Sequence, residues 1–426
     1  MRIARSVASG LCVAALATGA RTSHAQGAAA SVAEVRVENT TSIERPDETI
    51  GLPWEEVRSR VRGAAAGHVR VLDAVSGNEI VSQVVDDDGD GTMDELIFQG
   101  SFFPGEAKRY VVDNGVPKAT YAKARVYATH TMPRDDMAWE SDRIGFRTYG
   151  QGLWKVDSLL SSGIDVWVKR TRDPIVEKWY AKGHDAYHID TGEGADFFDV
   201  GQTLGAGGTA IWRNGTMYRA ANFKSWKIIA NGPVRTIFEM YYEPWDADGL
   251  RVSETKRISL DAGSNLNRAT SIFRVEGGGA TSDIPYVIGL VKRRGMVGSE
   301  SSAREWAWLS GWGPVSPKDG GHGELGTAVL IPKARVEGWK ESSDHYFAVA
   351  HAKPGEPVVH YIGAGWTDSG DFRGVADWWN YLDRFAERLG TPVVVTWTRA
   401  GAVRAKAGMK MPGRAMSGNG HEGARE

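Results

Sequence analysis

Arginine and tyrosine alternate along residues 143–149 with a spacing that can build a binding face. Arg143, Gly145, Arg147 and Tyr149 occupy every second position, and the first two positions between them are apolar. Because successive side chains of a strand point to opposite faces, this pattern predicts two cations and a phenol on one face of a sheet. A guanidinium grips a carboxylate through two parallel hydrogen bonds, and a phenol donates or accepts a proton. The segment is a candidate site for an anionic ligand, and a solvated face held by salt bridges is the alternative.

A long segment rich in glycine and titratable side chains, residues 183–208, is the second candidate site. Long loops of this composition more often bind or catalyse than merely connect. We select His188 as the candidate general base, because imidazole titrates near neutral pH and Asp190 or Asp196 can orient it. The same histidine and acids could instead ligate a metal. The residues that we expect to contact a ligand around these two segments are Trp139, Tyr187, Asp190, Glu193, Asp196 and Trp366.

Alternating aspartates form a third candidate, a cation site. Gly91 supplies a sharp turn among oxygen ligands of the kind that calcium prefers. The twelfth position from the first aspartate is Ile97 instead of a glutamate, which excludes an EF-hand. A polar hairpin with solvated carboxylates is the alternative to a structural Ca²⁺ site, and we expect no organic cofactor. The four candidate ligands are Asp86, Asp88, Asp90 and Asp94.

Short strands must position these residues, because runs of alternating or apolar residues recur along the chain and are separated by turn residues. One segment alone has a helical period: Trp378, Leu382, Phe385 and Leu389 are spaced by four, three and four residues, and Gly390 ends the helix. The pattern predicts an all-β protein with a large β-sandwich, a smaller N-terminal β module and one C-terminal helix. We expect a signal peptide at 1–25, a linker at 26–32, the N-terminal module at 33–115, the main sandwich domain at 116–398 and a disordered tail at 399–426.

The N-terminus and the charge balance indicate where the protein works. Arg2 and Arg5 precede a short apolar stretch that ends in a small-x-small sequence at Ser23–Ala25, which predicts export to the periplasm or beyond. The single cysteine, Cys12, lies inside this signal, so the mature chain depends on burial for its stability. Without residues 1–25, which carry three arginines and no acids, 51 Lys and Arg against 53 Asp and Glu leave an excess of five acids. Nucleic acid and anionic membranes are therefore not expected partners, and the oligomeric state stays open.

Four strings resemble a family of secreted bacterial proteins that is catalogued as a domain of unknown function. The genes of this family lie in polysaccharide-utilisation clusters. The strings are VVDDDGDGTMDELIFQ (84–99), WESDRIGFRTYG (139–150), YHIDTGEGADFFDVGQTLGAGG (187–208) and YIGAGWTDSGDF (361–372). A further string, ETKRISLDAGSNLNRAT (254–270), is similar to strands of galactose-mutarotase-like supersandwiches. The resemblance implies that fold and the breakdown of acidic polysaccharides, with dehydratase or lyase activity on unsaturated uronate oligosaccharides.

Residue chemistry and resemblance together favour an exported lyase or dehydratase whose partner is an acidic oligosaccharide. Removal of a proton next to a carboxylate requires a base, an acid and a cation that neutralises the carboxylate. We expect His188 to take the proton, Tyr149 to protonate the leaving oxygen, and Arg143 and Arg147 to neutralise the carboxylate.

Two alternatives stay open. A glycoside hydrolase would use a pair of carboxylates, and the candidates for that pair are Glu140, Glu193 and Asp196. A non-catalytic carbohydrate-binding protein would instead stack sugar rings on indoles such as Trp212 and Trp366. Formation of a new double bond, simple cleavage, or binding without turnover distinguishes the three hypotheses.

Overall fold

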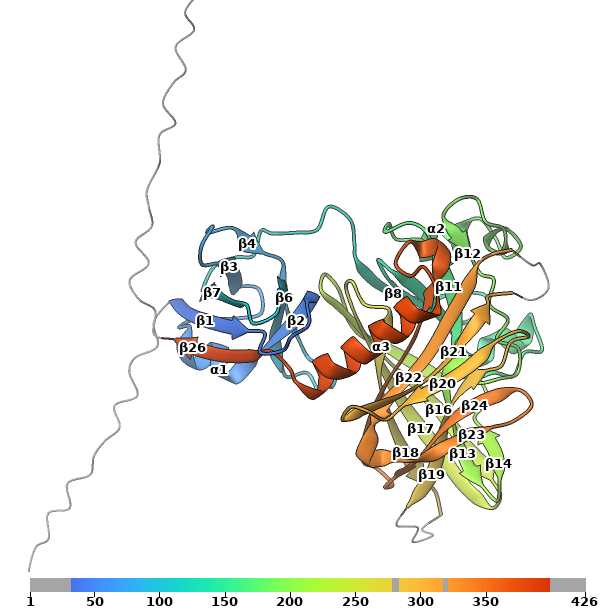
Figure 1. The fold of residues 1–426 in the computed structure, drawn as a ribbon. Coiled ribbons are helices and arrows are strands. Elements are labelled where there is room, and N and C mark those ends of the chain that lie inside the picture. The colour runs from blue at the N-terminus through green and yellow to red at the C-terminus, as the bar shows by residue number, and fades with distance from the viewer. Residues whose placement is uncertain (1–31, 278–282, 317–320, 399–426) are drawn as a thin grey trace, which may run out of the picture.

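Antiparallel strands make up most of the chain, and the predicted all-β class is confirmed. The computed structural model describes residues 32–277, 283–316 and 321–398. Within these ranges a small module stands beside a larger sandwich, as the blue and the green-to-orange parts of Figure 1 show. Outside the described residues lie the expected signal peptide at 1–25, all but the last residue of the expected linker at 26–32, and the expected tail at 399–426.

The N-terminal module consists of two sheets around its own apolar core. One sheet has the order β26-β1-β7-β3-β4 and the other the order β2-β6-β5. Side chains such as Val35, Val37, Leu96 and Phe98 are fully buried between them. The elements are β1 (Val32–Glu38), β2 (Arg45–Pro53), α1 (Trp54–Arg60), β3 (Arg70–Asp73), β4 (Glu79–Ile80), β5 (Ser82–Val85), β6 (Glu95–Phe102), β7 (Ala107–Asp113) and β26 (Val394–Thr398).

The last strand, β26, belongs to the N-terminal module, so the main domain does not extend to residue 398 as expected. β26 pairs antiparallel with β1, with Val35 opposite Trp397 and Val37 opposite Val395. Val395 and Trp397 of β26 pack against the core of the N-terminal module. The module is therefore built from both ends of the described chain, and the sandwich lies between them in the sequence.

Three sheets form the sandwich domain and share one large apolar core. The largest contains β15 (Ser225–Asn231), β16 (Arg235–Ala247), β17 (Leu250–Asp261), β18 (Leu266–Val275), β25 (Pro357–Trp366), β22 (Glu324–Pro332), β21 (Trp306–Pro314) and β20 (Val297–Ser301). The second contains β14 (Thr216–Arg219), β13 (Ala206–Arg213), β19 (Ile284–Val291), β24 (His345–Ala352) and β23 (Val336–Glu341). The third contains β12 (Gly194–Ala195), β11 (Asp165–Lys169), β10 (Ile144–Tyr149), β9 (Asp136–Ser141) and β8 (Val126–Thr131). The likeness to galactose-mutarotase sandwiches stays a prediction.

The predicted C-terminal helix is confirmed as α3 (Val375–Gly390), which ends at the expected glycine. Its apolar face packs on β21 and β22, and there the Nε1 of Trp378 donates to Ser310 Oγ at 2.9 Å. A Cβ added at Gly326 would lie 2.5 Å from the Trp378 ring, so this glycine lets the helix approach the sheet. Two shorter helices, α1 and α2 (Val176–Ala181), had no helical period in the sequence. No helix in the described part of the chain is long and apolar enough to cross a bilayer.

Removal of the Trp378 side chain tests whether α3 depends on this contact. The ring is fully buried, so Trp378→Ala leaves a cavity and is expected to lower the free energy of unfolding by about 3–5 kcal/mol. Trp154→Ala is the matched control, because its ring is 43% exposed and such changes usually stay within about 0.5 kcal/mol. Urea unfolding of both variants measures the difference, and equal midpoints would contradict the packing role.

Candidate functional site

One face of the sheet formed by β9, β10 and β11 carries charged side chains even though it is buried. Arg147 on β10 lies opposite Ala138 on β9 and Asp165 on β11, and Tyr149 lies opposite Asp136. Ile144 and Phe146, which alternate with Gly145 and Arg147 along β10, belong to the sandwich core. The predicted alternation therefore places Arg147 and Tyr149 on the same face, and it adds two aspartates from the neighbouring strands.

Arg147 is the centre of a buried network of hydrogen bonds and ion pairs. Its Nε and Nη2 donate to Asp165 Oδ2 at 2.9 and 2.6 Å, and Nη2 also donates to Asp196 Oδ2 at 2.7 Å. Its Nη1 donates to the Tyr187 hydroxyl at 3.0 Å. The Tyr149 hydroxyl donates to the same Asp165 oxygen at 3.1 Å. Side chains of Asp165, Asp196 and Tyr187 thus engage all three nitrogens of this guanidinium, so it is not available to grip a ligand carboxylate.

Burial sets the protonation of the acids in this network. It raises the pKa of Asp165, and the cation of Arg147 only partly offsets this effect. The pKa of Asp196 is raised well above its usual range by burial and then by the nearby charge of Asp165. Asp196 Oδ1 has no hydrogen-bond partner among the described residues. The folded chain therefore holds a proton here more tightly than the unfolded chain does.

His188 lies at the solvent-facing edge of the network, with 41% of its side chain exposed. Its Nδ1 is 2.8 Å from the main-chain oxygen of Asp196. Since a carbonyl only accepts, Nδ1 carries the hydrogen and Nε2 is left as the acceptor of the ring. Burial lowers the pKa of His188, which keeps the imidazole neutral near neutral pH. The rings of Tyr187 and His184 lie 4.8 and 5.1 Å from it.

Three members of this site were missed from the sequence. Asp165 and Asp136 stand at the starts of β11 and β9, and the alternation of Asp165 with Trp167 is the signal that could have found the first. Arg134 lies in the turn before β9, with its guanidinium 3.7 Å from Asp136 and 3.5 Å from Asp157. Its Nε has no hydrogen-bond partner among the described residues.

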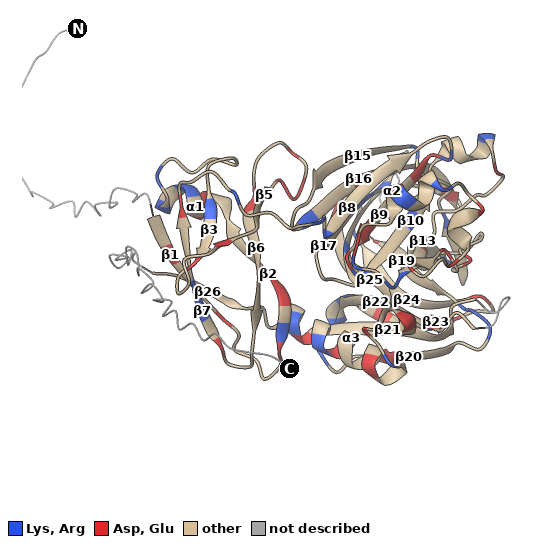
Figure 2. Cartoon of the chain, turned by 90° about the horizontal axis from the view of Figure 1, so that it is seen from above, with Lys and Arg blue, Asp and Glu red and all other residues tan. Residues whose placement is uncertain are grey.

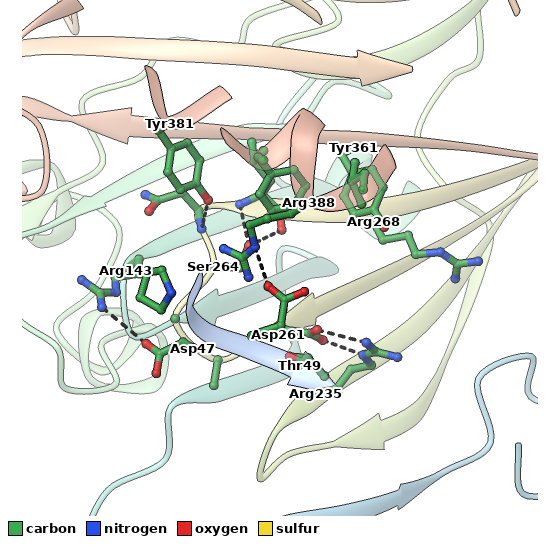
Figure 3. Close-up of a pocket in the computed structure, with 18 of the residues that line it drawn as sticks. Asp47, Thr49, Arg143, Arg235, Asp261, Ser264, Arg268, Tyr361, Tyr381 and Arg388 are labelled. Carbon is green, nitrogen blue, oxygen red and sulfur yellow. Dashed lines mark hydrogen bonds and ion pairs between the residues drawn. The ribbon is translucent and has the colours of Figure 1, made fainter. Parts of the chain in front are cut away.

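The expectation that Arg143 shares a face with Arg147 is wrong. β10 begins at Ile144, so Arg143 lies in the turn before the strand and the alternation does not extend to it. Its Nη1 donates to Asp371 Oδ1 at 2.8 Å, and its Nη2 is 3.7 Å from Asp47. These side chains line a cavity of about 380 Å³ between the N-terminal module and the sandwich (Figure 3).

The two tryptophans expected to contact a ligand are core residues. Trp139 is fully buried and donates from Nε1 to Asn267 Oδ1 at 2.7 Å. Trp366 is also buried, donates to the main-chain oxygen of His322 at 2.6 Å, and is covered by the Arg170 guanidinium at 4.6 Å. Both rings fill space between the sheets, so neither presents a face to a ligand. Their expected contact role is corrected to packing.

The remaining acids of the loop hold the chain in place. Asp190 pairs with Arg170 and accepts the main-chain N–H groups of Gly192 and Gly194. Glu193 pairs with Lys178, which lies on α2. Neither acid contacts His188, so Asp196 alone orients the imidazole, through its main-chain oxygen.

The carboxylate pair of the hydrolase alternative is not assembled around Glu140. Lys169 Nζ donates to Glu140 at 2.6 Å, and the N–H groups of Ile175 and Val176 donate to it at 2.9 Å. The carboxylate therefore binds the first N–H groups of α2, which have no partner within the helix. Glu140 is engaged in structure and is not free to act on a ligand.

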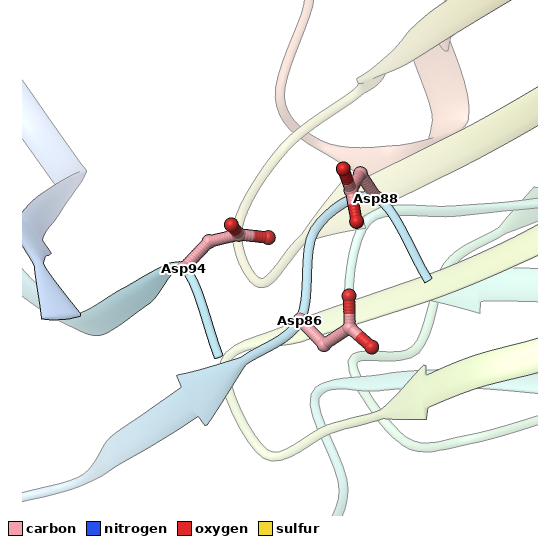
Figure 4. Close-up of side chains that lie close together, drawn as sticks. All are labelled: Asp86, Asp88 and Asp94. Carbon is pink, nitrogen blue, oxygen red and sulfur yellow. The ribbon is translucent and has the colours of Figure 1, made fainter. Parts of the chain in front are cut away.

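The acidic loop between β5 and β6 brings three of its four candidate ligands together. Carboxylate oxygens of Asp86, Asp88 and Asp94 lie within 4.8 Å of one another (Figure 4). Asp90 is not part of this group, and its carboxylate accepts the N–H of Thr92 at 2.6 Å. Calcium usually has about six to eight oxygen ligands, so these three carboxylates could hold it only together with oxygens from the main chain or from water. The calcium site stays a prediction.

Chelation tests the calcium prediction. If an ion is held, EGTA is expected to lower the melting temperature and added calcium to restore it, because a ligand of the native state stabilises it by about 2.7 kcal/mol at a hundredfold excess over Kd. Asp94→Asn should abolish this response, whereas Asp90→Asn should retain it, since Asp90 lies outside the group. Melting curves that do not respond to EGTA would leave the polar hairpin as the correct interpretation.

Loss of the buried cation tests the network. Arg147→Met leaves buried carboxylates without their partner, which is expected to cost about 3–5 kcal/mol of stability. Burial already raises the pKa values of Asp165 and Asp196, and the substitution removes the positive charge of Arg147 that lowers them. The folded variant therefore binds more protons than the unfolded variant, and its stability falls as pH rises. The loss should therefore be larger at about pH 8 than at about pH 5. Melting temperatures across this pH range measure the loss of stability. Arg172→Met, at an arginine with 42% of its side chain exposed, is the control. A loss of stability that does not depend on pH would contradict the proposed role of Arg147 in the network.

The chain is similar to several known proteins. Two solved structures from Enterococcus faecalis are an α-mannosidase of strain V583 (TM-score 0.46) and a protein in glycosyl hydrolase family 38 (TM-score 0.48), each 10% identical over 86% of this chain. The chain spans about half the length of these two structures, 46% and 47%. Uncharacterized protein P7 of Formosa agariphila is 33% identical over 383 residues, which cover 85% of this chain and 92% of the relative. The family described as domain of unknown function (DUF4861) matches residues 37–395, and the chain belongs to this family.

Proposed function

We propose that the chain is an exported carbohydrate-active enzyme of the lyase or dehydratase type that acts on uronate-containing oligosaccharides. The observation that carries this proposal is the half-exposed imidazole of His188, whose Nδ1 is fixed by a carbonyl and whose Nε2 is left to accept a proton. The acidic-sugar class and export rest on the sequence resemblance and on the N-terminal pattern.

In the proposed reaction Nε2 of His188 removes the proton from the carbon next to the substrate carboxylate. The electron pair of that C–H bond forms a C=C bond, and the C–O bond on the next carbon breaks. The imidazolium then returns its proton to the leaving oxygen, so that water or an alcohol departs and the base is regenerated. This single-residue cycle replaces the expected proton donor Tyr149, whose hydroxyl is buried against Asp165.

A cation must neutralise the substrate carboxylate before its neighbouring proton can be removed. Arg134 is the candidate in place of Arg143 and Arg147, because its contacts with Asp136 and Asp157, at 3.7 and 3.5 Å, are longer than hydrogen bonds. Burial raises the pKa of the Tyr187 hydroxyl, and the charges of Arg147 and then Arg134 oppose this effect, so Arg134 acts on the residue next to His188. Arg147 acts as a positioning residue that holds Asp196, which in turn holds the imidazole.

Removal of the imidazole tests this function. His188→Ala is expected to reduce turnover of uronate oligosaccharides by about 10²–10⁴-fold, the usual contribution of a positioned base. Because burial lowers the pKa of His188, the wild-type rate should persist below the ordinary histidine pKa and fall only at more acidic pH. Mass spectrometry of a panel of unsaturated and saturated uronate oligosaccharides, with ultraviolet absorbance, measures loss of water or appearance of a double bond. His68→Ala, an exposed change in the N-terminal module, is the control.

Three results would contradict the proposal. Cleavage with uptake of water and without a new double bond would indicate a hydrolase. Binding without turnover of any oligosaccharide would indicate a carbohydrate-binding protein. Turnover that His188→Ala leaves unchanged would place the reaction elsewhere in the molecule.

A further inference from the structure

The cavity that contains Arg143 is a second potential site, distinct from the His188 network. It has a volume of about 380 Å³ and lies between β2 of the N-terminal module, strands β16 to β18 and β25 of the sandwich, and α3. None of its lining residues belongs to the His188 network. Its volume falls within the range of about 300–1,000 Å³ that is typical of small-molecule sites.

Ion pairs form the polar wall of this cavity. Arg235 donates from Nε and Nη2 to the two carboxylate oxygens of Asp261 at 2.5 and 3.0 Å. Arg388 on α3 pairs with Glu48 on β2 at 2.6 Å, across the boundary between the module and the sandwich. The same wall therefore offers hydrogen-bond donors and acceptors side by side.

The acidic loop of the N-terminal module fixes part of this wall from outside. Asp87 lies 3.4 Å from Arg235 and 3.1 Å from Arg268, which both line the cavity. Arg257 and Lys227 donate to main-chain oxygens of the same loop. Figure 2 shows this red loop next to β5, on the side of the module that faces the sandwich. The loop thus holds cavity arginines in place whether or not it binds calcium.

Charges in the cavity lining balance. Each arginine of the lining has a carboxylate partner within 4.0 Å, so an incoming carboxylate would have to displace an acid that is already there. A neutral hydroxyl has no such competitor, because it can donate to a carboxylate and accept from a guanidinium at once. The lining arginines are Arg143, Arg235, Arg268 and Arg388, and the lining acids are Asp47, Glu48, Asp261 and Asp371.

Aromatic rings form the other side of the cavity. Tyr361 on β25 and Phe385 on α3 are in edge contact with centroids 5.2 Å apart, and Tyr381 lies 6.0 Å from Phe385. Figure 3 shows Tyr361 and Tyr381 on the opposite side of the cavity from Asp47 and Asp261. These three rings are only partly buried. An aromatic wall facing a wall of paired donors and acceptors matches a sugar ring, which has an apolar C–H face and a rim of hydroxyls.

We propose that this cavity binds a neutral pyranose residue of a saccharide. Its C–H face lies against the aromatic side, and its hydroxyls exchange hydrogen bonds with the paired acids and arginines. The proposal goes beyond the His188 chemistry and does not depend on it. A ligand in this position touches β2 as well as α3 and therefore joins the two parts of the molecule.

Binding of single sugars to the whole chain tests the proposal. Saturation-transfer NMR and calorimetry with glucose, galactose, mannose and xylose should detect at least one neutral pyranose, bound more tightly than glucuronic acid. Thr49→Trp fills the cavity without removing a charge, and Arg268→Ala removes one polar lining group. Each should weaken binding at least tenfold, whereas Arg274→Ala, an exposed change on the same strand β18 and outside the lining, should not.

The outcomes separate this site from the proposed reaction. His188→Ala should retain sugar binding in the cavity even where it loses turnover. Failure of all four neutral sugars to bind, tighter binding of glucuronic acid than of any neutral sugar, or unchanged binding in Thr49→Trp would each overturn the proposal.

Discussion

A guanidinium buried inside a protein must find its counter-charge there, and much of this site follows from that requirement. Arg147 sits on a strand whose two faces are both covered, so water cannot solvate it. The neighbouring strand β11 supplies Asp165, and the segment directly after β12 supplies Asp196. Because a buried charge without a partner is costly, the loop is held on the sheet at the residue whose main-chain oxygen orients His188.

Pairing of charged side chains also connects the N-terminal module to the sandwich, at the acidic loop and at the cavity. Residues of the N-terminal module meet the sandwich in a buried apolar cluster that includes Val85 and Val234. They also meet it through polar contacts, such as Asp87 with Arg235 and Arg268, and Glu48 with Arg388. Contacts of this kind need exact geometry and leave room between them. The cavity lies in the polar part of this boundary, whereas the apolar side chains pack directly against each other.

Periodicity in the sequence predicted most of the fold, because strands with a buried face must alternate and a helix on a sheet must repeat its apolar side chains. The alternating segment 143–149 became β10 from residue 144 onward, and the segment around Trp378 became α3. The site was predicted only in part. Alternation placed Arg147 with Tyr149, but it could not show that the strand begins one residue after Arg143. The partners Asp165 and Asp136 come from other strands, and pairing between strands is not visible in a single sequence.

The pairing of β26 with β1 has a consequence for the order in which the molecule can be completed. The sandwich is in effect an insertion into the N-terminal module, between β7 and β26. Since a chain is synthesised from its N-terminus, β1 is an edge strand with unpaired main-chain groups until residues 394–398 arrive. An exposed edge of this kind invites pairing with other chains. The N-terminal module is thus synthesised first but completed last. The edge of β1 stays exposed until the sandwich has folded and β26 has paired with it.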